Sequence, residues 1–206
     1  MAVVAHETGI DLVNFEQFCH LVPDGQKADL LDGVIFMASP DSFPADRLAG
    51  FVRTVMHMTV EMLGAGGVVV GSRFAFRLSE RRAPEPDVAY VARGRVSLIE
   101  NWGMPGPPDI AVEIVSRESR QRDYGEKRNI YEEAGVKEYW IIDPIQARCE
   151  FLTLGDDGKF QLARLAENRK FQSRVVEGLW IDVEWLLADP LPSVRDCLAE
   201  ICGPSR

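Results

Sequence analysis

The chain has 206 residues, of which 46% are hydrophobic, and its formal net charge is −9 at pH 7. No apolar run approaches the ~20 residues of a membrane-spanning helix, and the acidic balance argues against a surface that is basic throughout. The N-terminus lacks a basic region followed by an apolar segment, so we expect no secretory signal. We therefore predict a cytoplasmic protein without a membrane partner, folded as a single domain over residues 1–206.

Cysteine spacing gives no sign of a metal or disulfide framework. The four cysteines form no CxxC pair, and no histidine stands at a ligand-like spacing. Reduced cysteines are the expectation for a cytosolic chain. Positive charge gathers locally, in residues 73–95 and 117–128. A solvated face is the simpler interpretation of such clusters, but phosphate contacts act within about a Debye length of ~8–10 Å, so local nucleic-acid binding stays open.

The N-terminal half alternates short helices with short strands. Residues 1–10 are expected to lack regular structure, and a short helix is expected at residues 14–21. Apolar runs on either side of Asp32-Gly33 predict a β-hairpin. A long helix should cover residues 43–63, because its apolar side chains recur along one stripe. Strands are then expected at residues 68–71, 73–78 and 87–91, and a short helix at residues 95–102.

The C-terminal half begins with a strand, loop, helix and strand between Pro107 and Pro144. We expect these elements at residues 110–115, 123–134 and 138–143, followed by antiparallel strands at residues 148–154, 159–166 and 171–176. Helical fragments should follow from Asp182 onward. This order predicts a mixed α/β (α+β) fold, in which helices flank a mixed β-sheet. The predicted core covers about residues 15–185 and precedes a short helical C-terminal tail.

One acidic residue stands in the middle of an apolar strand. Glu113 lies within residues 110–115, where both faces are otherwise apolar, as in a central strand. An ionised carboxylate there is costly unless a cation or a donor compensates it. Lys127 falls in the middle of the sheet-facing side of the next helix, which makes it the nearest candidate partner. A buried ion pair without any function explains these two residues equally well.

A metal ion bound to Glu113 would need a second carboxylate from a neighbouring strand. Asp109 lies four residues away on the same strand, or about 13 Å at ~3.3 Å per residue. Two ligands of one Mg²⁺ must each come within ~2.0–2.1 Å of the ion. Asp87, which opens a strand directly after Pro86, is the natural supplier, and Asp29 in the first arm of the hairpin comes next.

Three stretches carry a resemblance to a known family: ADLLDGVIFMASP, PEPDVAYV and PPDIAVEIVSRESRQRDYGEKRNIYEEAGVKEYWIIDP. They are similar to the Uma-type restriction endonuclease family, a branch of the PD-(D/E)XK nuclease superfamily, over roughly residues 15–185. The resemblance implies a restriction-endonuclease-like sheet. In that superfamily an aspartate and a D/E-x-K motif on adjacent strands hold Mg²⁺ or Mn²⁺ beside the scissile phosphate. Asp87 matches the first acid and Glu113 the second.

The sequence departs from the simple motif, because Val115 holds its lysine position. The family that it resembles takes a lysine from the following helix instead, which matches Lys127. The resemblance thus implies that Lys127 orients the attacking water or offsets charge in the transition state. It also implies metal ligation by Asp87, Glu113 and the carbonyl of Ile114.

The resemblance implies further contacts around this centre. The family's usual glutamate in the first hairpin corresponds to Asp29, which is shorter and is expected to position a water or a second ion. Arg117, Arg120 and Arg122 would contact backbone phosphates, which contributes affinity without reading sequence.

Three functions remain open. The leading one is a divalent-metal-dependent endonuclease that hydrolyses phosphodiester bonds in DNA. The second is a catalytically degenerate nuclease fold that binds nucleic acid or regulates a partner, which the acidic net charge and the missing D/E-x-K lysine favour. The third is a phosphodiesterase that acts on RNA or a small nucleotide. A homodimer is expected only because two-fold dimers are common.

Overall fold

A six-stranded mixed β-sheet forms the centre of the fold in a computed structural model, which describes residues 12–203 apart from the side chain of residue 167. The residues 1–10 that we expected to lack regular structure lie outside this range. The parallel pair β7–β8 is flanked on each side by antiparallel neighbours, which confirms the predicted mixed sheet. The strand order is β10 (Phe160–Leu162), β9 (Arg148–Leu154), β8 (Glu138–Asp143), β7 (Ile110–Ile114), β5 (Val88–Val91) and β3 (Val68–Gly71).

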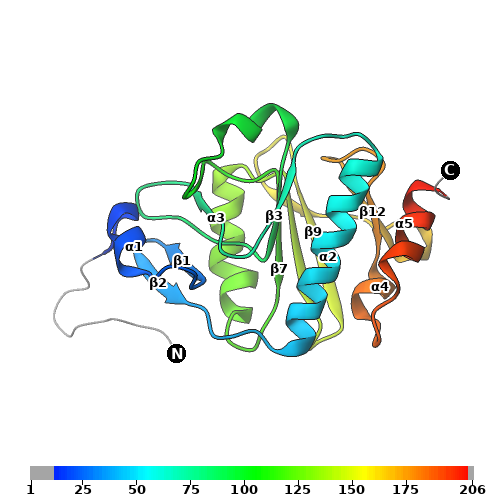
Figure 1. Cartoon of the computed structure of the whole chain (residues 1–206), viewed down its shortest axis with the longest axis horizontal. Coiled ribbons are helices and arrows are strands. Elements are labelled where there is room, and N and C mark those ends of the chain that lie inside the picture. The colour runs from blue at the N-terminus through cyan, green and yellow to red at the C-terminus, as the bar shows by residue number, and fades with distance from the viewer. Residues whose placement is uncertain (1–11, 204–206) are drawn as a thin grey trace.

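Helices cover both faces of this sheet, as predicted. Side chains of a strand alternate between faces, so Val112 packs towards α2 (Phe43–Met62), α4 (Val183–Leu187) and α5 (Val194–Cys202). Ala111 packs on the other face, with Tyr131 of α3 (Lys127–Ala134). Figure 1 shows α3 on one side of the sheet and α2 with α5 on the other. No helix within residues 12–203 is both long and apolar enough to span a bilayer.

A hairpin at the edge of the molecule carries the first acidic residue of interest. Strands β1 (Ala28–Leu31) and β2 (Val34–Met37) turn at Asp32-Gly33, where both residues have positive φ, as a tight hairpin turn requires. Leu30 and Ala83 exchange backbone hydrogen bonds of 3.1 and 2.8 Å. The hairpin is thereby fixed to the segment that leads into β5. The predicted helix α1 (Phe15–Leu21) packs on it, with Asn14 as its N-cap.

Several predicted elements differ in length or pairing. The strand expected at residues 73–78 is only β4 (Ala75–Arg77), and it pairs in parallel with β6 (Gly103–Pro105) in a separate sheet. A Cβ on Gly103 would lie 2.3 Å from the Ala75 carbonyl oxygen, so this pairing depends on a distant glycine. The strands expected at 159–166 and 171–176 are shorter, and are β10 and β11 (Lys170–Gln172). Strand β11 pairs with β12 (Trp180–Asp182). Short 3₁₀ helices occur at Arg93–Leu98 and Glu167–Arg169.

Aromatic stacking joins the C-terminal segment to the sheet. The Phe171 ring lies parallel to that of Phe151 at 4.2 Å between centroids, and both rings meet Trp140 edge-on. All three side chains are buried. We expect Phe171→Ala to lower the free energy of unfolding by about 3–5 kcal/mol, as for other buried aromatic truncations. Urea denaturation measures this loss; the exposed Leu162→Ala is the matched control, and equal losses in both variants would contradict this packing.

Candidate active site

Two acidic residues meet where neighbouring strands end. Strands β5 and β7 pair antiparallel with Val88 opposite Val112, so the next pair in register is Asp87 and Glu113. Side chains directly opposite each other in such a pair lie on the same side of the sheet. The Oδ2 atom of Asp87 accepts a hydrogen bond of 2.7 Å from the Ile114 amide. The carboxylate therefore takes the place of a strand carbonyl at the end of the ladder.

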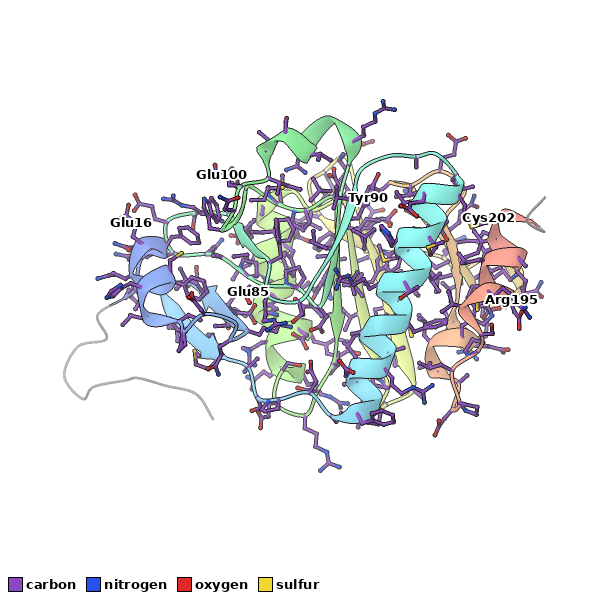
Figure 2. The ribbon with its side chains drawn as sticks, viewed as in Figure 1. Glu16, Glu85, Tyr90, Glu100, Arg195 and Cys202 are labelled. Carbon is purple, nitrogen blue, oxygen red and sulfur yellow. The ribbon has the colours of Figure 1, made fainter. Side chains whose placement is uncertain are left out.

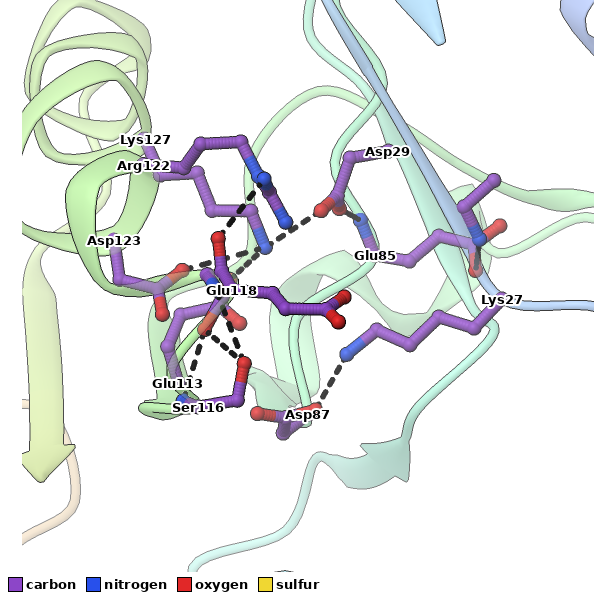
Figure 3. Close-up of polar contacts among 12 residues, drawn as sticks. Lys27, Asp29, Glu85, Asp87, Glu113, Ser116, Glu118, Arg122, Asp123 and Lys127 are labelled. Atoms are coloured by element: carbon purple, nitrogen blue, oxygen red, sulfur yellow. Dashed lines mark hydrogen bonds and ion pairs between the residues drawn. The ribbon is translucent and has the colours of Figure 1, made fainter. Parts of the chain in front are cut away.

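Lys127 lies among three carboxylates. Its Nζ atom donates to Oε1 of Glu113 at 2.8 Å, lies 2.8 Å from Oδ2 of Asp29, and is 3.9 Å from Oδ1 of Asp123 (Figure 3). The Tyr131 hydroxyl also donates to Oε1 of Glu113, at 2.9 Å. The predicted contact between Lys127 and Glu113 is therefore confirmed, and the lysine is only 2% exposed.

The helix that carries Lys127 begins differently from the prediction. We expected a regular helix from residue 123, but a π-helical turn covers Arg122–Glu126 and α3 begins only at Lys127. The Lys127 amide donates to the Arg122 carbonyl, five residues back. Such turns are rare in helices and are frequent at functional sites. The apolar periodicity of the sequence carries no signal for this change of hydrogen-bond pattern.

Asp29 is held by the segment before β5. Its Oδ1 atom accepts from the Glu85 amide at 2.8 Å, and Oε2 of Glu85 accepts from the Ala28 amide at 3.2 Å. These reciprocal bonds fix the hairpin beside β5. The Oδ2 atom of Asp29 is thereby brought to Lys127. The structure thus brings together all four predicted catalytic residues, whose roles stay predictions.

Three residues of this cluster were not singled out from the sequence. The Nζ atom of Lys27 donates to Oδ1 of Asp87. Glu85 is buried, and burial raises its pKa to about 7. Asp123 is 1% exposed, and burial raises its pKa to about 6, although the charge of Lys127 and the nearby Ser119 hydroxyl oppose this rise. Neither of its carboxylate oxygens meets hydrogen-bond geometry with a described residue. The position of Glu85 between two prolines could have marked it as a candidate site residue. The sequence around Lys27 has no comparable pattern.

A cleft of 570 Å³ opens onto this cluster. Of the three predicted phosphate-binding arginines, Arg117 and Arg122 line it, and the Arg122 guanidinium lies 4.9 Å from the centroid of the Phe36 ring. Arg120 instead pairs with the buried Asp143 at 2.8 Å. Its guanidinium is therefore engaged outside the cleft lining, which leaves Arg117 and Arg122 as the better candidates for phosphate contact. The acidic and lysine side chains of the lining are Lys27, Asp29, Asp41, Asp87, Glu113, Glu118 and Lys127.

Burial sets the charges of the cluster. It raises the pKa of Glu113 to about 8, although the charge of Lys127 opposes this. Burial also favours the neutral form of Asp29, but the charges of Lys127 and Lys27 hold the pKa of Asp29 below its ordinary value. Burial lowers the pKa of Lys127, yet Asp29 and Glu113 raise it well above its ordinary value. Lys127 therefore stays an ammonium ion and has no free electron pair with which to accept a proton.

Comparison with known proteins now decides the family. The family model of Uma2, described as "Putative restriction endonuclease", matches residues 13–184. The chain belongs to the Uma2 family. A crystal structure of a putative nuclease from Anabaena variabilis is similar in fold, with a TM-score of 0.68 and 14% identity over 85% of this chain and 97% of that one. At this identity the likeness concerns the fold. Among curated proteins, none matches this chain.

The Uma2 family resemblance implies a divalent cation, and the oxygen atoms present fit one. Mg²⁺ is usually bound by one or two carboxylates and keeps several waters. Asp87 and Glu113 supply two carboxylates, and burial raises the pKa of Glu113 to about 8 even though Lys127 is bonded to it, a rise that a further cation would oppose. Within residues 12–203, no group of three or more His, Cys, Asp or Glu side chains is arranged to hold a metal ion. Waters or phosphate oxygens would therefore complete the coordination; the carbonyl of Ile114 remains a predicted ligand.

Proposed function

We propose that this Uma2 family member is a Mg²⁺- or Mn²⁺-dependent endonuclease that hydrolyses phosphodiester bonds in DNA. The observation that carries the proposal is the meeting of Asp87 and Glu113 at one end of adjacent strands, with Lys127 bonded to Glu113. Membership of the family supports a nuclease. The cleft that opens beside these residues also carries Arg117 and Arg122, which suits an anionic substrate.

Each polar residue has a distinct part in this mechanism. A bound divalent cation would act as a Lewis acid and lower the pKa of a water molecule. Asp87, Glu113 and the carbonyl of Ile114 would hold the ion. Lys127 stays protonated, so it orients Glu113 and offsets negative charge at the phosphate, and does not act as a base. Both oxygens of Asp29 are bonded, which favours a role in holding Lys127 over direct ion binding.

The decisive test is cleavage of supercoiled plasmid DNA. We expect nicking with Mg²⁺ or Mn²⁺, none with a chelator, and none in Asp87→Asn. A substrate panel of DNA, RNA and a small cyclic nucleotide would separate the DNA endonuclease from a phosphodiesterase of another specificity. Wild-type protein that cleaves none of these substrates under any of these conditions would refute the proposal.

A degenerate nuclease fold is the second candidate function. The observation that favours it is that both oxygens of Asp87 are already bonded within the protein, to Lys27 and to the Ile114 amide. Val115 also stands at the lysine position of the simple motif. This candidate predicts no heat of Mn²⁺ binding in calorimetry, together with salt-dependent binding of nucleic acid or binding of a protein partner.

The cleft arginines should bind phosphates without reading sequence. We expect Arg117→Ala to weaken DNA binding and to reduce the slope of log affinity against log salt by about one. Fluorescence anisotropy in the presence of a chelator measures both quantities. Arg195→Ala is the matched control, because Arg195 lies on α5, far across the molecule from Glu85 and the hairpin (Figure 2). Equal weakening in both variants would contradict a specific contact.

We also propose a cytoplasmic homodimer. All four cysteines are free thiols, which supports a reducing compartment. The dimer has only the general frequency of two-fold assemblies behind it. Light scattering at several protein concentrations measures the mass directly, and a constant monomer mass would refute the dimer.

A further inference from the structure

Lys27 is bonded to the carboxylate oxygen of Asp87 that a metal ion would need. Its Oδ2 atom accepts from the Ile114 amide, and its Oδ1 atom accepts from Nζ of Lys27 (Figure 3). The Ile114 bond is part of the strand end and is fixed by the sheet. Access to Oδ1 therefore depends on where the Lys27 side chain lies.

The two lysines of the cluster differ in their access to the substrate. The Lys127 side chain is 3% exposed and is surrounded by Asp29, Glu113 and Asp123. The Lys27 side chain is 16% exposed, and it lines both the 570 Å³ cleft and a neighbouring cleft of 650 Å³. The two clefts share Lys27, Asp87 and the segment 38–41. A chain that passes from one cleft to the other therefore crosses Lys27 and Asp87.

The backbone of Lys27 is fixed while its side chain is a flexible stem. Its carbonyl accepts a hydrogen bond of 3.0 Å from the Ala38 amide, which continues the hairpin by one pair. A lysine ammonium is a compact charge on a four-carbon chain with three rotatable donors. Lys27 can therefore leave Oδ1 of Asp87 without moving the hairpin, and it can still reach an anion in either cleft.

We propose that Lys27 is a second functional lysine, which competes with the metal ion for Asp87 and contacts the scissile phosphate during catalysis. This inference rests on the proposed nuclease function. In the metal-free protein, Lys27 neutralises Asp87 and keeps it aligned. A divalent cation held by Asp87 would repel the ammonium from that oxygen, and the negative charge of the phosphate would attract it. Lys27 is thus a catalytic residue that contacts the phosphate directly, in addition to the part of Lys127, which holds Glu113 and offsets charge from a more buried position.

The proposal requires metal affinity and cleavage rate to change in opposite directions. Lys27→Met removes the competitor for Oδ1, so Mn²⁺ should bind several-fold more tightly in calorimetry. The same variant loses the cation at the phosphate, so single-turnover cleavage should slow by about 10²-fold, as for other lost electrostatic contacts. Lys27→Arg should keep part of the cleavage rate. If the pair of Lys27 with Asp87 is purely structural, metal affinity and thermal stability should instead both fall in Lys27→Met.

The matched control is Lys137→Met. Lys137 also pairs with a buried carboxylate, that of Asp109 at 2.8 Å, but it lies beside the beginning of β7, at the other end of that strand from Ile114. We expect wild-type metal affinity and cleavage in this variant. Lys27→Gln, which keeps a polar side chain, serves as a second variant if Lys27→Met unfolds; circular dichroism monitors folding in all of them.

Each outcome separates the inference from the proposed function. Wild-type protein that binds Mn²⁺ and cleaves DNA, with a folded Lys27 variant that cleaves equally fast, overturns only the role of Lys27. So does a folded variant that binds Mn²⁺ no more tightly than the wild type. Wild-type protein that neither binds Mn²⁺ nor cleaves any substrate overturns the nuclease function, and the role of Lys27 with it.

Discussion

Glu113→Gln is expected to slow DNA cleavage severely while the protein stays folded. The amide keeps an oxygen that can accept from Lys127 and Tyr131, so the local hydrogen bonds survive. The amide has no negative charge with which to bind a metal ion. Loss of several kcal/mol of transition-state stabilisation corresponds to a rate about 10³-fold lower. Single-turnover cleavage measures the rate, and calorimetry with Mn²⁺ measures the lost affinity.

The same substitution should change how stability depends on pH. Burial raises the pKa of Glu113 to about 8 in the folded state, against ~4.3 for an unfolded glutamate. A raised pKa contributes stability that is fully present below ~4.3 and is lost as pH rises through about 8. Glutamine does not titrate, so its variant does not lose this stability. We therefore expect the free energy of unfolding of Glu113→Gln, relative to that of the wild type, to increase from pH 5 to pH 9. Thermal unfolding in metal-free buffer at both pH values measures this difference.

Glu61→Gln is the control for both effects. Glu61 lies in the last turn of α2, whereas the cleft is lined by Pro44 and Ala45 at the other end of that helix. The Glu61→Gln variant should cleave DNA at the wild-type rate, and its stability should depend on pH as that of the wild type does. Cleavage at the wild-type rate in Glu113→Gln would remove this residue from the site. A constant stability difference between pH 5 and pH 9 would contradict the raised pKa.

The sequence predicted those parts of the site that depend on one element at a time. Helical spacing placed Lys127 on the sheet-facing side of its helix, and burial of an acid in an apolar strand required a partner for Glu113. Their contact followed from these two facts alone. The position of Asp87 beside Glu113 could be predicted as well, because a second carboxylate for an ion at Glu113 would have to come from a neighbouring strand, and a proline marked the start of that strand.

Features that depend on how distant segments dock could not be predicted. Lys27 lies one residue before a strand, in a polar stretch with no periodic signal, and it meets Asp87 only because the hairpin is bonded to Ala83. The parallel pairing of β4 with β6 depends on the missing side chain of Gly103. Local propensity carries no information about such long-range pairs. The π-helical turn before Lys127 was missed for a different reason, because apolar spacing does not report the hydrogen-bond pattern of a turn.

Lys127→Met is expected to destabilise the protein more than any other substitution in the cluster. Methionine fills a similar volume, so the loss is mainly one of charge. It leaves Asp29, Glu113 and Asp123 buried without the cation that contacts the first two at 2.8 Å. Removing one partner of a buried ion pair typically lowers the free energy of unfolding by about 3–5 kcal/mol. Urea denaturation near neutral pH measures the loss, and cleavage by the fraction that remains folded should fall as well.

The double variant Lys127→Met with Asp29→Asn tests the cause of this loss. Asparagine keeps an oxygen that can accept from the Glu85 amide, as Asp29 does at 2.8 Å, but it carries no charge. If the loss arises from an uncompensated buried carboxylate, the double variant should be more stable than Lys127→Met alone. A double variant whose destabilisation equals the sum of the two single losses would show that packing, not charge, makes Lys127 necessary for folding. Recovery of stability without recovery of cleavage would separate the structural part of Lys127 from its part in the reaction.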